Sequence, residues 1–108
     1  MAGDLENQLR LTQDQLRERV RMGDRLEAAR QIEHSAEFSR KGQARAAARD
    51  LEACGYSVKI GRRGFKALLE ASKSSPIDSA TAEAFVREVV GIVERYGGSY
   101  DGWGGTVE

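Results

Sequence analysis

The residues that could carry catalysis are few and far apart in the chain. Its 108 residues include one histidine, His34, and one cysteine, Cys54. Nucleophilic catalysis needs an activating base within hydrogen-bond reach, and the sequence indicates no Ser-His-Asp or Cys-His arrangement. Cys54 also precedes Gly55 at the expected end of a helix, where the negative end of the helix dipole makes a thiol a poor nucleophile. The sequence therefore predicts that the protein is not an enzyme.

Metal and cofactor sites are not indicated either. His34 and Cys54 lie 20 positions apart, which is not a metal-ligand spacing. Gly61 and Gly64 do not belong to a phosphate-binding GxxxxGK[ST] loop. No cofactor and no metal are expected, and His34 is interpreted as a structural residue of a strand. A ligand pocket formed by Glu33, His34 and Asp101 stays open as an alternative.

Composition describes a small soluble domain with balanced charge. Basic and acidic residues number 17 each, and hydrophobic residues make up 40% of the chain. No apolar run approaches the ~20 residues of a membrane helix, and no signal-peptide core precedes the domain. We therefore expect a cytoplasmic protein with no membrane partner. The charge is uneven, since residues 31–63 carry seven basic and four acidic side chains and residues 64–108 carry four and seven.

The first 23 residues predict a helix, and residues 24–108 a single domain. Asp4 can cap the start of the helix and Gly23 can end it. A helical stripe is formed by Leu5, Leu9, Leu16 and Val20, with Thr12 or Gln13 filling its gap. The helix either docks on the domain through this stripe or binds a partner with Leu11 and Met22 as added apolar surface.

The remaining pattern predicts the order strand, helix, strand, strand, helix, strand. Residues 31–39 alternate between apolar and polar side chains, with His34 among the apolar ones, and a helix follows over 40–54 after a Ser39 cap. Residues 56–60 form a strand, residues 61–64 a hairpin turn, and Phe65 begins the buried side of the next strand. A helix capped by Asp78 or Ser79 and a last extended segment, residues 99–107, complete the chain. The expected fold is therefore α+β, a ferredoxin-like βαββαβ sandwich with an additional N-terminal helix. The second face of the sheet is left open or partly covered by that helix.

This fold raises the question of RNA binding, which the residue pattern does not favour. RNA-recognition domains of this architecture stack bases on aromatic side chains of the open face of the two central strands. Here Phe38 and Phe65 are expected on the buried side, whereas Glu33, Glu37 and Glu70 face outward and repel phosphate. Direct nucleic-acid binding is therefore not expected, and the arginines of residues 40–63 are interpreted as a solvated edge.

The closing run Ser99-Tyr100-Asp101-Gly102-Trp103-Gly104-Gly105 is the most unusual stretch of the sequence. Glycine weakens a strand, so this density of glycine predicts a bulge or a close approach of backbone. Trp103 is then either a core anchor or, with Tyr100 and Asp101, part of a binding surface, since Trp and Tyr often dominate interfaces. The two interpretations do not exclude each other.

Five stretches together resemble the RraB family, the regulators of ribonuclease E activity. They are Tyr100-Asp101-Gly102-Trp103-Gly104, Gly23-Asp24, Ile32-Glu33-His34, Leu51-Glu52-Ala53-Cys54-Gly55-Tyr56 and Pro76-Ile77-Asp78. The resemblance covers about residues 20–108 and implies a ferredoxin-like fold, a bacterial source and a non-catalytic role in RNA decay. Known regulators of this family are strongly acidic and carry an acidic tail, whereas this chain is neutral and its sequence ends at Glu108.

The expected function is therefore that of a protein-binding regulator, an inhibitor or modulator of ribonuclease E-type RNA degradation. The alternative is an immunity-type or other protein-binding module with an unrelated target enzyme. The residues expected to bind the partner are Glu33, His34, Tyr100, Asp101 and Trp103. The neutral charge balance and the open sheet face also permit a homodimer.

Overall fold

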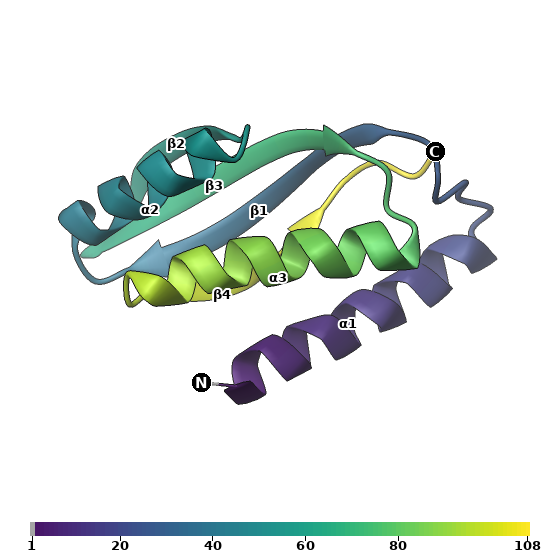
Figure 1. Cartoon of the computed structure of the whole chain (residues 1–108), viewed down its shortest axis with the longest axis horizontal. Helices are drawn as coiled ribbons and strands as arrows, with labels where there is room; N and C mark the ends of the chain where they lie inside the picture. Colours follow the sequence, from purple (N-terminus) through teal and green to yellow (C-terminus); the bar gives the residue numbers. More distant parts are fainter. Residues whose placement is uncertain (1) are drawn as a thin grey trace.

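A computed structural model describes residues 2–108, which form three helices and four strands. The helices are α1 (Ala2–Arg21), α2 (Lys41–Ala53) and α3 (Ser79–Arg95). The strands are β1 (Arg30–Phe38), β2 (Ser57–Arg63), β3 (Lys66–Ser75) and β4 (Ser99–Gly104). The chain order is therefore helix α1 followed by βαββαβ, as the sequence predicts (Figure 1).

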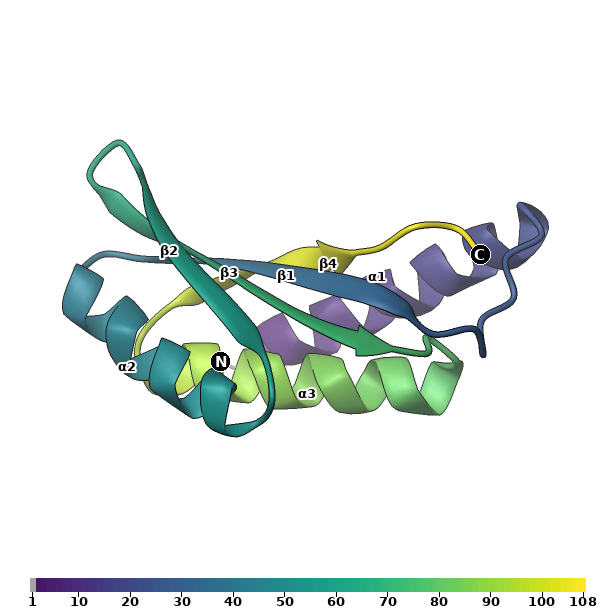
Figure 2. The same cartoon turned by 90° about the horizontal axis from the view of Figure 1, so that it is seen from above.

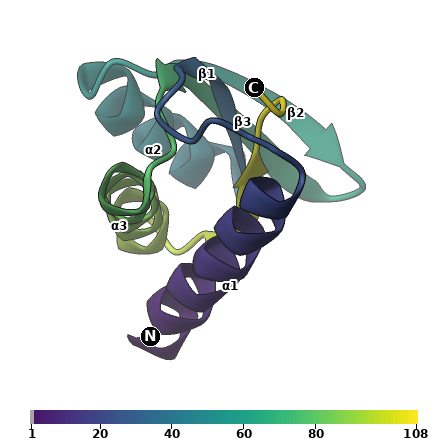
Figure 3. The same ribbon diagram turned by 90° about the vertical axis from the view of Figure 1, so that its right-hand side faces the viewer.

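The four strands form one antiparallel sheet in the order β2-β3-β1-β4. Both β1 and β3 are central. The strands of each βαβ unit are not neighbours: β3 lies between β1 and β2, and β1 lies between β3 and β4, as the ferredoxin-like motif requires. All three helices lie on one side of the sheet, and the other side is open (Figures 2 and 3). The α+β prediction with an added N-terminal helix is confirmed.

The core lies between the sheet and α2 and α3. In α2 the small side chains of Ala44, Ala47 and Ala48 are buried, which lets this helix approach the sheet closely. The helix begins after Arg40, one residue later than the predicted Ser39 cap. In α3 the Asp78 side chain accepts a hydrogen bond from the Thr81 backbone N–H and caps the helix, as predicted. The buried residues of α3 are Ala82, Phe85, Val86, Val89, Val90, Ile92 and Val93.

Helix α1 packs against α3 and along the outer edge of β4, so of the two alternatives for the second sheet face, open or partly covered by this helix, the open one is correct. Gln13 donates hydrogen bonds of 2.9 Å to Ser79 and Glu83 at the start of α3. The amide nitrogens of Gln8 and Gln15 lie 3.4 and 3.5 Å from the carbonyl oxygens of Tyr100 and Trp103 on β4. The helix thereby supplies donors to a sheet edge that would otherwise be unpaired.

The stripe predicted for α1 is correct except at its end. Leu16 and Thr12 are buried, but Val20 is 57% exposed and Arg19 is buried in its place. A charged residue can take a buried position when it is paired, and Arg19 has such a partner in Asp24. Leu11 and Met22 are exposed, as the partner-binding alternative for this helix requires.

The β2–β3 hairpin is longer than the sequence suggests. Arg63 pairs with Lys66, so the turn consists of Gly64 and Phe65, and Arg62 and Arg63 belong to β2. Gly64 adopts a positive φ of 62°, which glycine accepts without strain. Phe65 consequently sits at the tip and is 98% exposed, so its predicted place on the buried side of β3 is wrong.

A bulge interrupts the pairing of β4 with β1, as the glycines of the closing run predict. Ala36 pairs with Tyr100, but Ser35 pairs with Gly102, so one additional residue is accommodated in β4. Gly102 has a φ of 134° at this point. Side chains three positions apart normally face opposite sides of a strand. The bulge instead puts Tyr100 and Trp103 on the same side as the helices.

No helix among residues 2–108 has the length and apolar character needed to cross a membrane.

Candidate functional site

The five residues expected to bind a partner are close together but lie on two sides of the sheet. Glu33 and Asp101 line a hollow on the open side. His34 and Tyr100 are buried on the helix side, and Trp103 packs there at the border with α1. The structure therefore brings all five to the β1–β4 pair, with the two carboxylates facing outward.

The open side of the sheet carries a group of carboxylates that we call the acidic face. It consists of Glu33, Glu37, Glu70 and Asp101. Glu33, Glu70 and Asp101 surround a shallow hollow of about 500 Å³, floored by the glycines of the bulged strand. Partial burial and the nearby Glu37 carboxylate raise the pKa of Asp101, while Arg63 and Lys66 act in the opposite direction. This arrangement places three carboxylates around one hollow, which Arg63 also lines.

Cations on the same side of the sheet temper the acidic face: Lys59 pairs in register with Glu70, and Arg63 and Lys66 act on Asp101. The Arg63 guanidinium lies 3.6 Å from the Glu37 carboxylate, and it also lines the hollow. Both side chains of this pair retain contact with solvent, so the pair adds little to stability. Asp101 lies near this pair, as the influence of Glu37 and Arg63 on its pKa shows, whereas Glu33 lies farther along β1.

His34 is held inside the protein as a neutral side chain. Its Nδ1 lies 2.8 Å from the Tyr100 hydroxyl, and its ring makes edge contacts with Phe85 and Tyr56 at 5.1 and 5.6 Å between centroids. Burial lowers the pKa of His34 from 6.5 to about 4, because the charged imidazolium would lose its hydration. Burial likewise raises the pKa of Tyr100. The pair is therefore a neutral hydrogen bond that ties β1 to β4.

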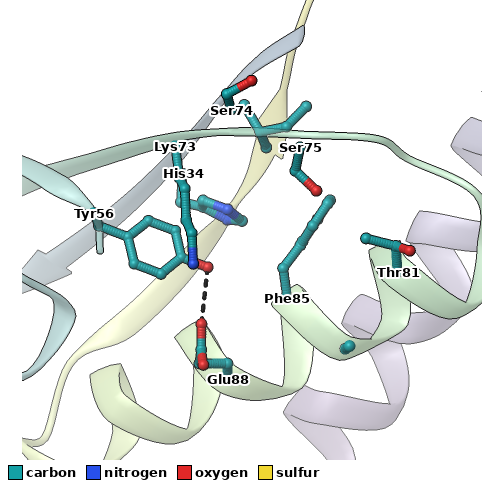
Figure 4. Close-up of a pocket in the computed structure, with 10 residues that line it drawn as sticks. His34, Tyr56, Lys73, Ser74, Ser75, Thr81, Phe85 and Glu88 are labelled. Carbon is teal, nitrogen blue, oxygen red and sulfur yellow. Dashed lines mark hydrogen bonds between the residues drawn. The ribbon is translucent and has the colours of Figure 1, made fainter. Parts of the chain in front are cut away.

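A cavity of about 200 Å³ lies beside His34, between the end of β3 and α3 (Figure 4). The Tyr56 hydroxyl donates a hydrogen bond of 3.1 Å to Glu88, and Lys73 donates one of 2.8 Å to the Cys54 carbonyl. Tyr56 and Glu88 are thus paired with each other, and Lys73 is held by a backbone carbonyl. Within residues 2–108, no group of three side chains could hold a metal ion. Asp101 is not among the residues that line the cavity, so the alternative pocket of Glu33, His34 and Asp101 is not formed.

Trp103 joins three elements. Its indole Nε1 donates a hydrogen bond of 3.1 Å to Thr12 of α1, and its ring makes an edge contact of 5.0 Å with Phe85 of α3. The Arg19 guanidinium lies 5.4 Å from the ring centroid. Trp103 is therefore an anchor between β4 and the two helices, which is the first of the two predicted roles.

Sequence reasoning missed a buried cluster of charges beside the site. Asp24 accepts hydrogen bonds of 2.7 and 2.8 Å from Arg30 and one of 3.2 Å from Arg19. Asp24 belongs to the Gly23-Asp24 stretch of the family pattern, but the expected loop from Asp24 to Arg30 gave no reason to bury it. Four arginines lie within six positions of Asp24, and nothing in the sequence singles out Arg19 and Arg30 among them.

The neutral state of His34 predicts a pH effect on stability. The unfolded chain binds a proton at His34 below about pH 6.5, whereas the native state binds one only near pH 4. The free energy of unfolding is therefore highest above pH 6.5. It decreases as the pH falls toward 4, by ~3 kcal/mol in total. Urea unfolding across this range should show a flatter profile for His34→Gln than for the wild type. Parallel profiles would contradict a neutral buried His34.

Comparison with known families gives one match. The family model described as RraB, regulator of ribonuclease activity B, matches residues 10–105. This range covers most of α1, the whole sheet and the closing run. A search of curated proteins found no match.

Proposed function

The chain belongs to the RraB family, and on that premise we propose that it is a non-catalytic protein that binds and modulates a ribonuclease of the ribonuclease E type. The family is one of regulators of ribonuclease activity. We further propose that the protein inhibits this ribonuclease by occupying a surface of it, and that it acts in the bacterial cytoplasm.

The acidic face is the observation that carries this proposal. A whole-chain net charge of zero offers no general attraction for a basic partner. The open side of the sheet, however, gathers Glu33, Glu70 and Asp101 around one hollow. Complementary potentials of this kind steer association and select partners. The occupant proposed for the hollow is a basic segment of the ribonuclease.

The five partner-binding residues divide into two proposed roles. Glu33 and Asp101 contact the partner directly because they face the open side. His34, Tyr100 and Trp103 are positioning residues, since their contacts on the helix side hold the bulged strand in place. The bulge in turn fixes where Asp101 stands relative to Glu33.

The double variant Glu33→Gln/Asp101→Asn should weaken binding to purified ribonuclease E about three- to tenfold at low salt, since exposed charges contribute ~0.2–1 kcal/mol each. Most of the loss should appear in the association rate and should diminish as salt is added. Surface plasmon resonance measures both quantities, and cleavage of an RNA substrate reports the inhibition.

Glu6→Gln/Glu52→Gln is the matched control, because these exposed carboxylates lie on α1 and α2, away from the open side. Equal weakening by the control would show that net charge, not the acidic face, governs binding. Failure of the wild type to bind ribonuclease E would reject this target. Binding to an unrelated toxic enzyme would then favour the immunity-type alternative.

A further inference from the structure

The tip of the β2–β3 hairpin carries an aromatic side chain that the fold does not use. Phe65 is 98% exposed beside Gly64. The hairpin extends beyond the helices and the rest of the sheet, at the upper left of Figure 2. An exposed phenylalanine buries almost no apolar surface, so Phe65 adds little to the stability of the fold. Packing within this fold does not account for its place at the tip.

Basic side chains surround Phe65. Lys41 of α2, Arg62 of β2 and Lys66 of β3 line a hollow of about 270 Å³ together with the phenyl ring. Arg62 pairs with the buried Ala67 and so points to the helix side, whereas Arg63 contacts Glu37 on the open side. Cations therefore flank the ring from both sides of the hairpin. We call Lys41, Arg62, Arg63, Phe65 and Lys66 the basic tip.

The charge of the basic tip is compensated only in part. Arg63 has a carboxylate partner in Glu37 at 3.6 Å. Among residues 2–108, Lys41, Arg62 and Lys66 form no ion pair within 4.0 Å. Lys66 lies near enough to Asp101 to lower the pKa of that carboxyl, so Lys41 and Arg62 are the cations whose charge an anionic ligand in the hollow would chiefly compensate.

We propose that the basic tip binds single-stranded nucleic acid, with an unpaired base stacked on Phe65 and the adjacent phosphates held by Lys41, Arg62 and Lys66. Proteins that bind single strands without strong sequence preference combine aromatic rings with a cationic track for the backbone. A base must be unpaired to expose a face to such a ring, which excludes a regular duplex.

The surroundings of Phe65 favour a nucleic acid over a protein partner. The anchors of protein interfaces lie among apolar neighbours that exclude water. The residues that share the hollow with Phe65 are instead two lysines, an arginine, a glycine and an alanine. A nucleotide needs only one ring for its base and cations for its phosphates, and the basic tip supplies both.

This site differs from the RNA platform that the sequence disfavours. That platform would lie on the open side of β1 and β3, where Glu33 and Glu70 repel phosphate. The basic tip lies at the far end of the hairpin and requires no ribonuclease. The test below therefore uses the chain alone, and its failure would leave the regulator proposal untouched.

The test is fluorescence anisotropy of a labelled, unstructured single-stranded RNA of about 10 nucleotides with the full chain. Phe65→Ala should weaken binding about tenfold and leave the salt dependence unchanged, because it removes stacking but no charge. Arg62→Gln and Lys66→Gln should each reduce the slope of log affinity against log salt by about 0.7. Since Phe65 is exposed, Phe65→Ala should unfold at the same temperature as the wild type.

Val20→Ala and Arg21→Gln are the matched controls, because they remove an exposed apolar side chain and an exposed cation from α1. Both should bind the RNA as the wild type does. The proposal is overturned if the wild type does not bind, if Phe65→Ala has no effect, or if the controls weaken binding equally. Tighter Phe65-dependent binding to an acidic peptide or to anionic lipid vesicles would also overturn it, in favour of that ligand.

Discussion

Asp24→Asn should destabilise the protein by about 3–5 kcal/mol, the largest loss expected from any single polar substitution in this chain. Asp24 is the one carboxylate between two arginines, and its side chain is fully shielded from solvent. The Arg30 side chain is 1% exposed and that of Arg19 is 9% exposed. Without the carboxylate, two buried guanidinium groups would face each other with no compensating charge.

The cluster matters because it joins three distant segments of the chain. Arg19 belongs to the last turn of α1, and Arg30 begins β1. Both also donate hydrogen bonds to the carbonyl groups that follow β4, Arg19 to Gly105 at 2.9 Å and Arg30 to Thr106 at 2.9 Å. Loss of Asp24 would therefore loosen the end of α1, the entry to β1 and the C-terminal segment together.

The cluster also predicts how stability responds to acid. The Arg30 hydrogen bond, helped by Arg19, lowers the pKa of Asp24 below its ordinary value. A lowered native pKa gives stabilisation that is complete above the unfolded pKa of about 3.9 and is lost as the pH falls through the native one. The difference in unfolding free energy between Asp24→Asn and the wild type should therefore disappear at strongly acidic pH.

Urea unfolding followed by circular dichroism measures both effects. Asp14→Asn is the matched control, since Asp14 forms an exposed ion pair with Arg17 on the same helix and should change stability by less than about 1 kcal/mol. A loss at Asp24 no larger than that of the control would show that the buried cluster contributes nothing specific.

Helices, strands and buried residues could be predicted from the sequence where a pattern within a few consecutive residues determines them. The alternation around His34 predicted β1 and its buried side, and the alanine stripe predicted how α2 packs. The glycines of the closing run predicted the bulge. In each case a period of 2 or 3.6, or a demand for unusual backbone, was visible in a few consecutive residues.

The errors arose where the period of one helix or strand did not decide the position of a side chain. Phe65 fits the period of β3, but pairing of Arg63 with Lys66 shortened the turn and left the ring at the tip. Arg19 is buried because Asp24 and the end of β4 lie beside it, which no helical period can show. The alternation of β1 predicts that Glu33 and His34 face opposite sides of the sheet. The position of Trp103 beside His34 depends on the register shift at the bulge, which the sequence does not locate.

Trp103→Ala should destabilise the protein by about 3 kcal/mol, the low end of the range for removing a packed tryptophan, because the ring is only partly buried. The substitution removes the edge contact with Phe85, the cation–π contact with Arg19 and the hydrogen bond to Thr12. Two of these three contacts lie on α1, so the helix should lose much of its hold on β4. Hydrogen exchange should accordingly accelerate in α1 more than in β1 or β3.

Trp103→Phe separates the contributions of the ring and its N–H group. Phenylalanine keeps an aromatic contact with Phe85 but cannot donate to Thr12, so we expect a loss of about 1 kcal/mol. If Trp103 positions the acidic face, Trp103→Phe should still bind the ribonuclease, whereas Trp103→Ala should lose stability and affinity together. An alanine variant of unchanged stability that no longer binds would instead make Trp103 an interface residue. The closing run would then present its tryptophan, and not only Asp101, to the partner.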